Sequence, residues 1–82
     1  STSHLNAYKL NNQNFITIEG LANQGSLTHL KLYDILGKHV ISATLDDQTN
    51  TQTVSTEGIS IGIYIITLKS GNTLLTKKII IK

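Results

Sequence analysis

Histidines are the residues of this chain best suited to bind a metal or transfer a proton, and there are three: His4, His29 and His39. A zinc site normally takes three or four protein ligands, with further hydrogen bonds that orient them. The spacing predicts no local cluster, although His29 and His39 fall on strands that a hairpin would pair. We interpret these two as polar residues on the solvent side of a sheet, and we expect neither a metal ligand nor a cofactor.

A second group of candidate ligands comprises Asp46, Asp47, Gln48 and Asn50, whose side chains all carry oxygen. Calcium prefers oxygen ligands, but this segment lacks the glycine and the distal glutamate of an EF-hand loop. The sequence therefore favours a solvated loop and leaves a weak calcium site open.

Hydrolytic chemistry has little support in the sequence. Serine, histidine and aspartate all occur, but there is no Gly-x-Ser-x-Gly segment to expose a nucleophile. Glu19 and Glu57 would be the carboxylates of a glycosidase pair, yet nothing brings them together, and a small sandwich has little room for a cleft. No helix start follows any glycine, so a phosphate-binding loop is not expected. We predict that the domain is not an enzyme.

The composition also excludes several kinds of partner. The chain has 82 residues, which indicates one domain, with a formal net charge of +2 and only four aromatic residues. Its seven basic residues are all lysine, whereas guanine recognition usually relies on arginine and single strands usually stack on aromatic side chains. No apolar run approaches the ~20 residues of a membrane helix. We therefore expect no nucleic-acid partner and no membrane span.

Strand-forming residues dominate the chain, and no segment has a convincing helical period. Strands are predicted at residues 6–10, 14–20, 27–36, 39–45, around Val54, 62–69 and 73–82. Loops are predicted at 20–26, 46–53 and 55–62, and turns at Gly37–Lys38 and at 70–72 around Gly71. In the loop at 55–62, Ile59 and Ile61 are expected to form an apolar plug.

These elements predict an all-β fold, namely a single antiparallel, immunoglobulin-like β-sandwich of about seven strands. The domain is expected to span residues 6–82, with residues 1–5 as the end of a linker. Residues 62–69 are apolar on both faces, which is typical of a strand at the centre of a sheet.

The last residues of the sequence form an apolar run that needs a partner. Residues 62–69 are expected to pair with 73–82, which would place Ile79, Ile80 and Ile81 in the core of this hairpin. Lys77, Lys78 and Lys82 flank them. Lysines beside an exposed sheet edge discourage pairing with neighbouring molecules.

The segment LKLYDILGKHVIS, residues 30–42, has a Tyr, an Asp, a Gly, a basic residue and an aliphatic strand at Tyr33, Asp34, Gly37, Lys38 and Val40. Residues 54–82 have a Gly-x-Tyr motif at Gly62 and Tyr64 and a Lys-Ile finish at Lys77–Lys82. Both segments resemble the type A C-terminal sorting domains of the type IX secretion system of Bacteroidota, whose internal motif has Asn or Asp after the Tyr and whose ending has the same two features. The upstream Asn-Pro motif of many members is missing, which leaves the position of any processing site open.

The resemblance implies a secretion signal without catalysis of its own. Such a domain folds in the periplasm, is read by the outer-membrane translocon and its shuttle protein, and directs an upstream cargo domain of the same chain across the outer membrane. A sortase-like surface peptidase often removes it later, and the cargo is secreted or attached to the cell surface. The residues expected to be recognised are Gly62, Tyr64, Lys77, Lys78, Ile79, Ile80, Ile81 and Lys82. The residues expected to shape turns and motifs are Tyr33, Asp34, Gly37, Lys38 and Gly71.

Other interpretations stay open on the sequence alone. Gly37, Gly62 and Tyr64 also fit purely structural roles in turns and packing. The alternative function is a small carbohydrate-binding, adhesion or spacer module attached to a secreted enzyme. Four aromatic residues scattered along the chain argue against a sugar-binding face.

Overall fold

The computed structural model describes residues 5–82, so His4 and all but one residue of the expected linker end lie outside the described part. Within residues 5–82, seven strands and one short 3-10 turn follow one another. They are β1 (Asn6–Tyr8), β2 (Phe15–Glu19), η1 (Leu21–Asn23), β3 (Thr28–Asp34), β4 (His39–Leu45), β5 (Thr51–Ser55), β6 (Gly62–Ser70) and β7 (Thr73–Ile81). No helix in this described part is long and apolar enough to cross a membrane.

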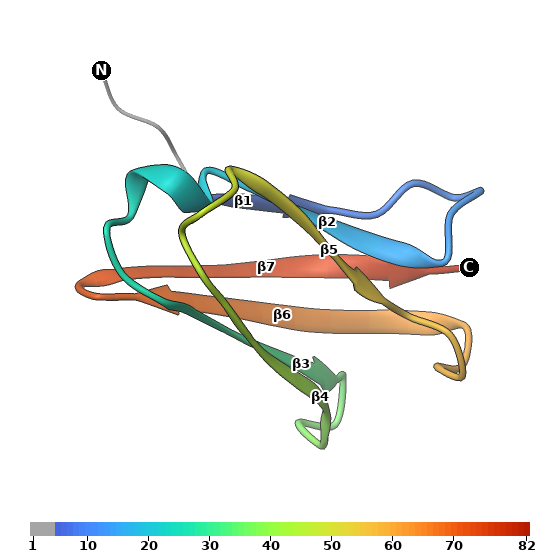
Figure 1. Ribbon diagram of the computed structural model, residues 1–82. Coiled ribbons are helices and arrows are strands. Elements are labelled where there is room, and N and C mark those ends of the chain that lie inside the picture. The colour runs from blue at the N-terminus through green and yellow to red at the C-terminus, as the bar shows by residue number, and fades with distance from the viewer. Residues whose placement is uncertain (1–4) are drawn as a thin grey trace.

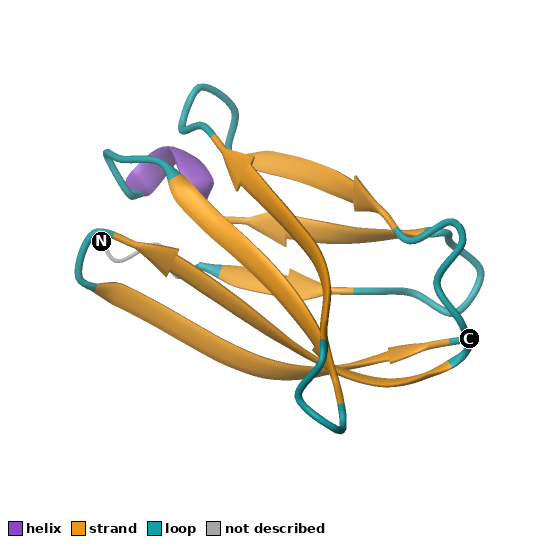
Figure 2. Cartoon of the chain, turned by 90° about the horizontal axis from the view of Figure 1, so that it is seen from below, coloured by secondary structure: helices purple, strands orange, loops and turns teal. Residues whose placement is uncertain are grey.

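The strands form two sheets that face each other, which confirms the predicted antiparallel β-sandwich. The smaller sheet has the order β1-β2-β5 and the larger one the order β4-β3-β6-β7. All neighbouring strands are antiparallel. Figure 1 shows β1 and β2 above β7 and β6 of the larger sheet, with β5 running obliquely across β7 in this view, and Figure 2 shows the strands and their connecting loops from below.

Alternation of apolar and polar residues explains which face of each strand is buried. In β3, Thr28, Leu30 and Leu32 are buried, whereas His29 and Lys31 are exposed. A strand with one face on the core and one in water has this two-residue period. The sequence pattern of β3 and β4 therefore predicts both the hairpin and the face that it buries.

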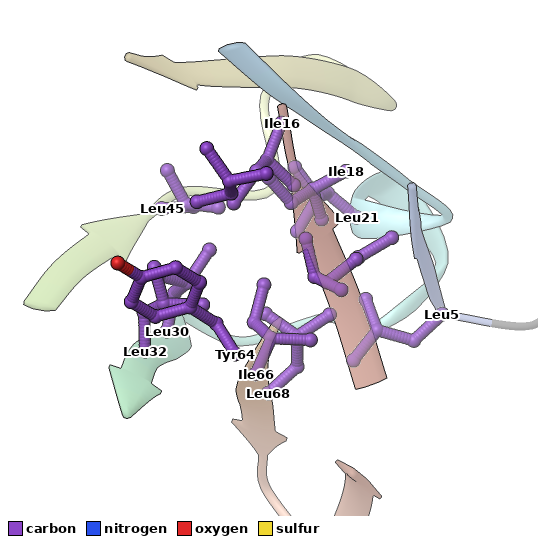
Figure 3. Packing of buried hydrophobic residues seen from close by; sticks show 13 residues of the cluster. Leu5, Ile16, Ile18, Leu21, Leu30, Leu32, Leu45, Tyr64, Ile66 and Leu68 are labelled. Carbon is purple, nitrogen blue, oxygen red and sulfur yellow. The ribbon is translucent and has the colours of Figure 1, made fainter. Parts of the chain in front are cut away.

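Side chains from both sheets fill the space between the layers (Figure 3). The smaller sheet and its flanks contribute Leu5, Ala7, Ile16, Ile18 and Leu21, and the larger sheet contributes Leu30, Leu32, Leu45, Tyr64, Ile66, Leu68, Ile79 and Ile81. In the described part of the chain all buried apolar residues belong to this one cluster, whereas nine large apolar side chains are exposed, as expected of a small domain.

Two predictions for the middle of the chain are wrong. The loop expected at residues 46–53 ends earlier, because β5 begins at Thr51 and pairs with β2 along its whole length. Backbone pairing places these residues in a strand although their side chains are polar. In the loop after β5, Ile59 packs against the core as expected, but Ile61 is 80% exposed and forms no plug.

The apolar run at the end of β7 is only partly core. Ile79 and Ile81 are 4% and 3% exposed, whereas Ile80 is 49% exposed. The expectation that all three isoleucines are buried is therefore wrong for Ile80. Successive side chains of a strand point to opposite faces, so Ile80 faces solvent on the outside of the larger sheet.

Candidate functional site

The β6–β7 hairpin brings together the two halves of the C-terminal motif. In its register Gly62 lies opposite Ile81, and Tyr64 lies opposite Ile79. Residues that are about 15 to 20 positions apart in the sequence are thus direct neighbours across the two strands. This part of the predicted recognition set forms one continuous structure at the end of the larger sheet.

Tyr64 joins the core to the loop that precedes β6. Its ring is buried in the cluster, and its hydroxyl donates a hydrogen bond of 2.7 Å to the backbone oxygen of Ser60 (Figure 3). Gly62 lies under the edge of this ring, since a Cβ atom added there would be 3.6 Å from Tyr64 Cε1. The Gly-x-Tyr motif therefore has a clear packing role, and a partner that binds the folded domain would reach little of Tyr64.

The turn between β6 and β7 requires glycine at its first position. Gly71 has a φ of 56°, and the two-residue link Gly71–Asn72 joins the paired residues Ser70 and Thr73. Two-residue hairpin turns need positive φ at this position, which glycine adopts without steric cost. The predicted structural role of Gly71 follows from this geometry.

β7 is an edge strand, so one side of its backbone has no neighbour within the larger sheet. An antiparallel ladder turns the backbone N–H of every second residue away from the partner strand. Counted from the two-residue turn, these outward residues are Leu74, Thr76, Lys78 and Ile80. Sheet edges of this kind can accept an added strand.

A groove runs beside the C-terminal half of this edge, and we call it the edge groove. It has a volume of about 260 Å³. Its lining consists of Tyr8, Lys9 and Asn11 on one side and of Lys77, Lys78, Ile79 and Ile80 of β7 on the other. The open backbone of β7 therefore lies in a depression whose opposite wall comes from the end of β1 and the loop after it.

Lys77 closes the sandwich next to the edge groove. Its Nζ donates hydrogen bonds to Ala7 O at 2.7 Å and to Asn6 Oδ1 at 3.1 Å, both in β1. These bonds join the edge strands of the two sheets, and the side chain is half-buried. The amino group of Lys77 is therefore used within the fold. Lys78 and Lys82 are exposed and could both contribute positive charge to a surface that a partner contacts.

The first sequence motif forms the turn between β3 and β4. Asp34 Oδ1 accepts hydrogen bonds from the backbone N–H groups of Leu36 and Lys38, each at 2.9 Å. The backbone N–H of Gly37 donates to Asp34 O at 3.0 Å, and Gly37 has a φ of 87°, which favours glycine. The ring of Tyr33 meets that of His39 edge to face, with 5.8 Å between centroids. Tyr33, Asp34 and Gly37 of this motif thus have local structural roles.

Replacing Asp34 with alanine should lower the free energy of unfolding by about 1–3 kcal/mol, because two backbone N–H groups lose their acceptor. Asp34→Asn keeps an oxygen in the same place and should cost less than about 1 kcal/mol. Urea unfolding of the three proteins checks this. Equal losses for the two variants would mean that the charge of Asp34, rather than its hydrogen bonds, stabilises the turn.

The other candidate residues do not converge on one site. His29 lies opposite Thr44, whereas His39 lies opposite Tyr33, so the two histidines do not face each other. Glu19 and Ser55 lie at opposite ends of the β2–β5 pair, and Glu57 follows Ser55, which separates the two glutamates. Within residues 5–82 no group of three or more His, Cys, Asp or Glu side chains is placed to hold a metal ion.

The oxygen-rich segment uses several of its oxygens for local hydrogen bonds. Asp46 Oδ1 accepts from the N–H of Gln48 and from Gln52 Nε2, both at 3.1 Å. Asn50 O accepts from the N–H of Leu21 at 3.1 Å, which attaches the segment to η1. The segment therefore orders the loop between the two sheets.

Sequence reasoning missed the far wall of the edge groove. Tyr8, Lys9 and Asn11 are not among the residues that the sequence singles out, although they lie across the groove from β7. The partners of Lys77 are 70 and 71 positions away in the sequence. The pattern of apolar and polar residues along a strand cannot predict contacts between residues so far apart in the sequence. Only the three-dimensional structure shows these contacts.

Comparison with known families agrees with this geometry. A family model described as the secretion system C-terminal sorting domain matches residues 10–82. A comparison with curated proteins gives no match. The matched range covers the Asp34 turn, the Gly-x-Tyr motif and the whole β6–β7 hairpin. The chain therefore belongs to the family of C-terminal sorting domains, the sorting signals by which the type IX secretion system exports proteins across the outer membrane.

Proposed function

We propose that the outer-membrane translocon and its shuttle protein read this domain at the edge groove, and that the backbone of β7 pairs there with a strand of the receptor. In transit the domain and its upstream cargo are periplasmic, and afterwards the cargo is secreted or held at the cell surface. A sortase-like surface peptidase is the candidate for later removal of the domain. The domain itself carries out no catalysis.

The observation that carries this proposal is the position of β7 at the sheet edge with a groove beside its C-terminal half. Strand addition gives affinity through backbone hydrogen bonds and specificity through alternate side chains. Lys78 and Ile80 offer such side chains, because both are exposed on the outward face of β7. Ile79 and Ile81 hold the strand in place from the core side. Gly62 and Tyr64 support recognition indirectly, by shaping the hairpin.

The lack of catalysis is supported by what the polar side chains do in the fold. Asp34 and Asp46 accept hydrogen bonds from neighbouring backbone or amide groups. The four aromatic residues do not gather on one face, since Tyr64 is buried in the core and Tyr33 lies in the other sheet from Tyr8 and Phe15, which are on the neighbouring strands β1 and β2. Aromatic stacking of sugars would therefore be limited to that pair.

Export of a fusion protein tests the sorting role. Residues 1–82 are fused to a fluorescent cargo in a bacterium with an active type IX system, and fluorescence is measured in the periplasm and outside the cell. The fusion should appear outside. If it stays in the periplasm although the domain is folded, the chain does not act as a sorting signal.

Two variants at Lys78 then test the edge groove. Lys78→Pro removes an outward N–H from the edge strand, where proline is tolerated, whereas Lys78→Ala removes only the side chain. Thr53→Pro is the matched control, because Thr53 is an exposed residue of β5, the edge strand of the smaller sheet, and lies outside the groove. Lys78→Pro should stop export, and the other two should not. Export of a folded Lys78→Pro fusion at the normal level would rule out strand pairing there.

A further inference from the structure

The outward face of the larger sheet carries positive charge without any side-chain carboxylate. We call this surface, formed by the outward side chains of β4, β3, β6 and β7, the outer face. Lys31, Lys69 and Lys78 are exposed on it, together with His29. All five side-chain carboxylates of the chain lie elsewhere. Glu19 is in β2, and Asp46, Asp47 and Glu57 are in loops. Asp34 is the last residue of β3, and its side chain turns to the backbone N–H groups of the following turn.

The register places Lys31 and Lys69 at one end of the outer face, with His29 beside them, whereas Lys78 lies at the other end. His29 lies opposite Lys69 on the neighbouring strand, and Lys69 lies opposite Leu74. Lys31 is next along β3 on the same face. These four residues line one groove of about 490 Å³ near the β6–β7 turn. A concave cationic surface concentrates potential and favours an anionic group.

The other end of the outer face is apolar. Tyr33 lies opposite Ile65, which lies opposite Lys78, and Ile63 lies opposite Ile80 one step further along. Ile63 is 44% exposed, similar to Ile80, although both are large aliphatic side chains in regular strands. A cluster of exposed aliphatic residues beside charged ones is the composition of a protein interface, with an apolar centre and a polar rim.

We propose that the outer face is a second docking surface of this sorting domain, and that its partner is an acidic protein surface with an apolar centre. This inference rests on the proposed sorting function. It specifies the charge and the apolar character of one surface of the receptor. Carboxylates of the partner would enter the groove beside Lys31 and Lys69, and its apolar residues would cover Ile63 and Ile80.

An anionic glycan fits the outer face less well than a protein does. Sugars are usually held by aromatic stacking, and Tyr33, the aromatic residue of this face, already packs against His39. The exposed isoleucines offer sugars nothing to hydrogen-bond, whereas they match aliphatic side chains of a protein partner.

Binding of the purified 82-residue domain to inside-out outer-membrane vesicles, which present the periplasmic side, from the type IX-competent bacterium tests the proposal. The test variant is Lys31→Gln/Lys69→Gln, which lowers the net charge by two. The matched control, Asn12→Asp/Asn14→Asp, lowers it equally at exposed positions in the loop between β1 and β2. Ile63→Gln tests the apolar end. Thermal melting accompanies each variant to show that it is folded.

We expect the lysine variant to bind about tenfold more weakly, mainly through slower association that is sensitive to salt, because charges at an interface act largely by steering. Ile63→Gln should bind more weakly at all salt concentrations, and the asparagine control should bind like the original domain. Protease treatment of the vesicles should abolish binding. If protease-treated vesicles, or vesicles of purified lipopolysaccharide, bind the domain equally well, the partner is a glycan and the proposal is wrong.

The same variants in the fluorescent fusion separate this proposal from the sorting role. Slower export of Lys31→Gln/Lys69→Gln with normal export of the asparagine control supports docking at the outer face. If the original fusion is exported and the lysine variant shows unchanged export and binding, the proposal of docking at the outer face is wrong, whereas the sorting role stands. Failure of the original fusion to leave the periplasm overturns the sorting role instead.

Discussion

Ile81→Ala should lower the free energy of unfolding by about 2–4 kcal/mol, and Ile79→Ala should do the same. Both side chains are almost fully buried between the sheets, so truncation removes apolar contacts and leaves a cavity. A domain of this size has a stability near the lower end of the usual range of roughly 5–15 kcal/mol, so either variant should melt at a much lower temperature. Urea unfolding and thermal melting measure the loss.

Ile80→Ala is the matched control for these variants, since it has the same chemistry in the same strand. Half of this side chain is exposed, and its removal should change stability by less than about 1 kcal/mol. Its export should nevertheless fall if the edge groove and the outer face are read by receptors. A loss of stability at Ile80 as large as that at Ile79 would contradict the alternation of faces along β7.

Tyr64→Ala should be at least as damaging, with a loss of about 3–5 kcal/mol of unfolding free energy. The ring fills the core beside Gly62, and the hydroxyl ties the preceding loop to β6 through Ser60. Tyr64→Phe keeps the ring and removes only the 2.7 Å hydrogen bond, which should cost about 0.5–1.5 kcal/mol. Chemical unfolding followed by circular dichroism compares the two.

Export of the Tyr64→Ala and Tyr64→Phe variants also tests whether the Gly-x-Tyr motif acts by packing or by direct contact with a receptor. If it shapes the hairpin, export should follow the folded fraction, so Tyr64→Phe should be exported nearly normally at a temperature where it is folded. A Tyr64→Phe domain that is fully folded but not exported would show that a receptor contacts the hydroxyl directly. The motif would then act by direct recognition rather than by packing.

Several features of the fold were predictable because they depend on local chemistry. The alternation of Leu30 and Leu32 with His29 and Lys31 specifies the buried face of β3. Asp34 and Gly37 are residues that turns require, and the two-residue link at Gly71–Asn72 is a typical hairpin signal. Each of these predictions needs only a few neighbouring residues.

The remaining features depend on contacts between distant segments. β5 starts at Thr51 because this residue pairs with Glu19 of β2. The polar side chains of this segment do not by themselves predict a strand. The run of apolar residues at 79–81 suggests burial at every position, but the sheet buries only one face of β7. Ile59 and Ile61 lie in the loop before β6, where the path of the chain, rather than an alternation of faces, decides which of them is buried. The hydrogen bonds of Lys77 to β1 likewise arise from the way the two sheets close on each other.

The position of β6 and β7 in the core has a consequence for the timing of folding. Five of the thirteen residues of the buried cluster, namely Tyr64, Ile66, Leu68, Ile79 and Ile81, come from these two strands, which are the last of the seven to emerge during synthesis or passage through a membrane pore. β3 pairs with β6 only after about thirty intervening residues have been made, and such long-range pairing delays folding. A polypeptide that stops before β6 thus lacks more than a third of the buried residues that form the interior. The domain can fold only after β7 has been made, so its folded state would mark a cargo that is complete up to that strand.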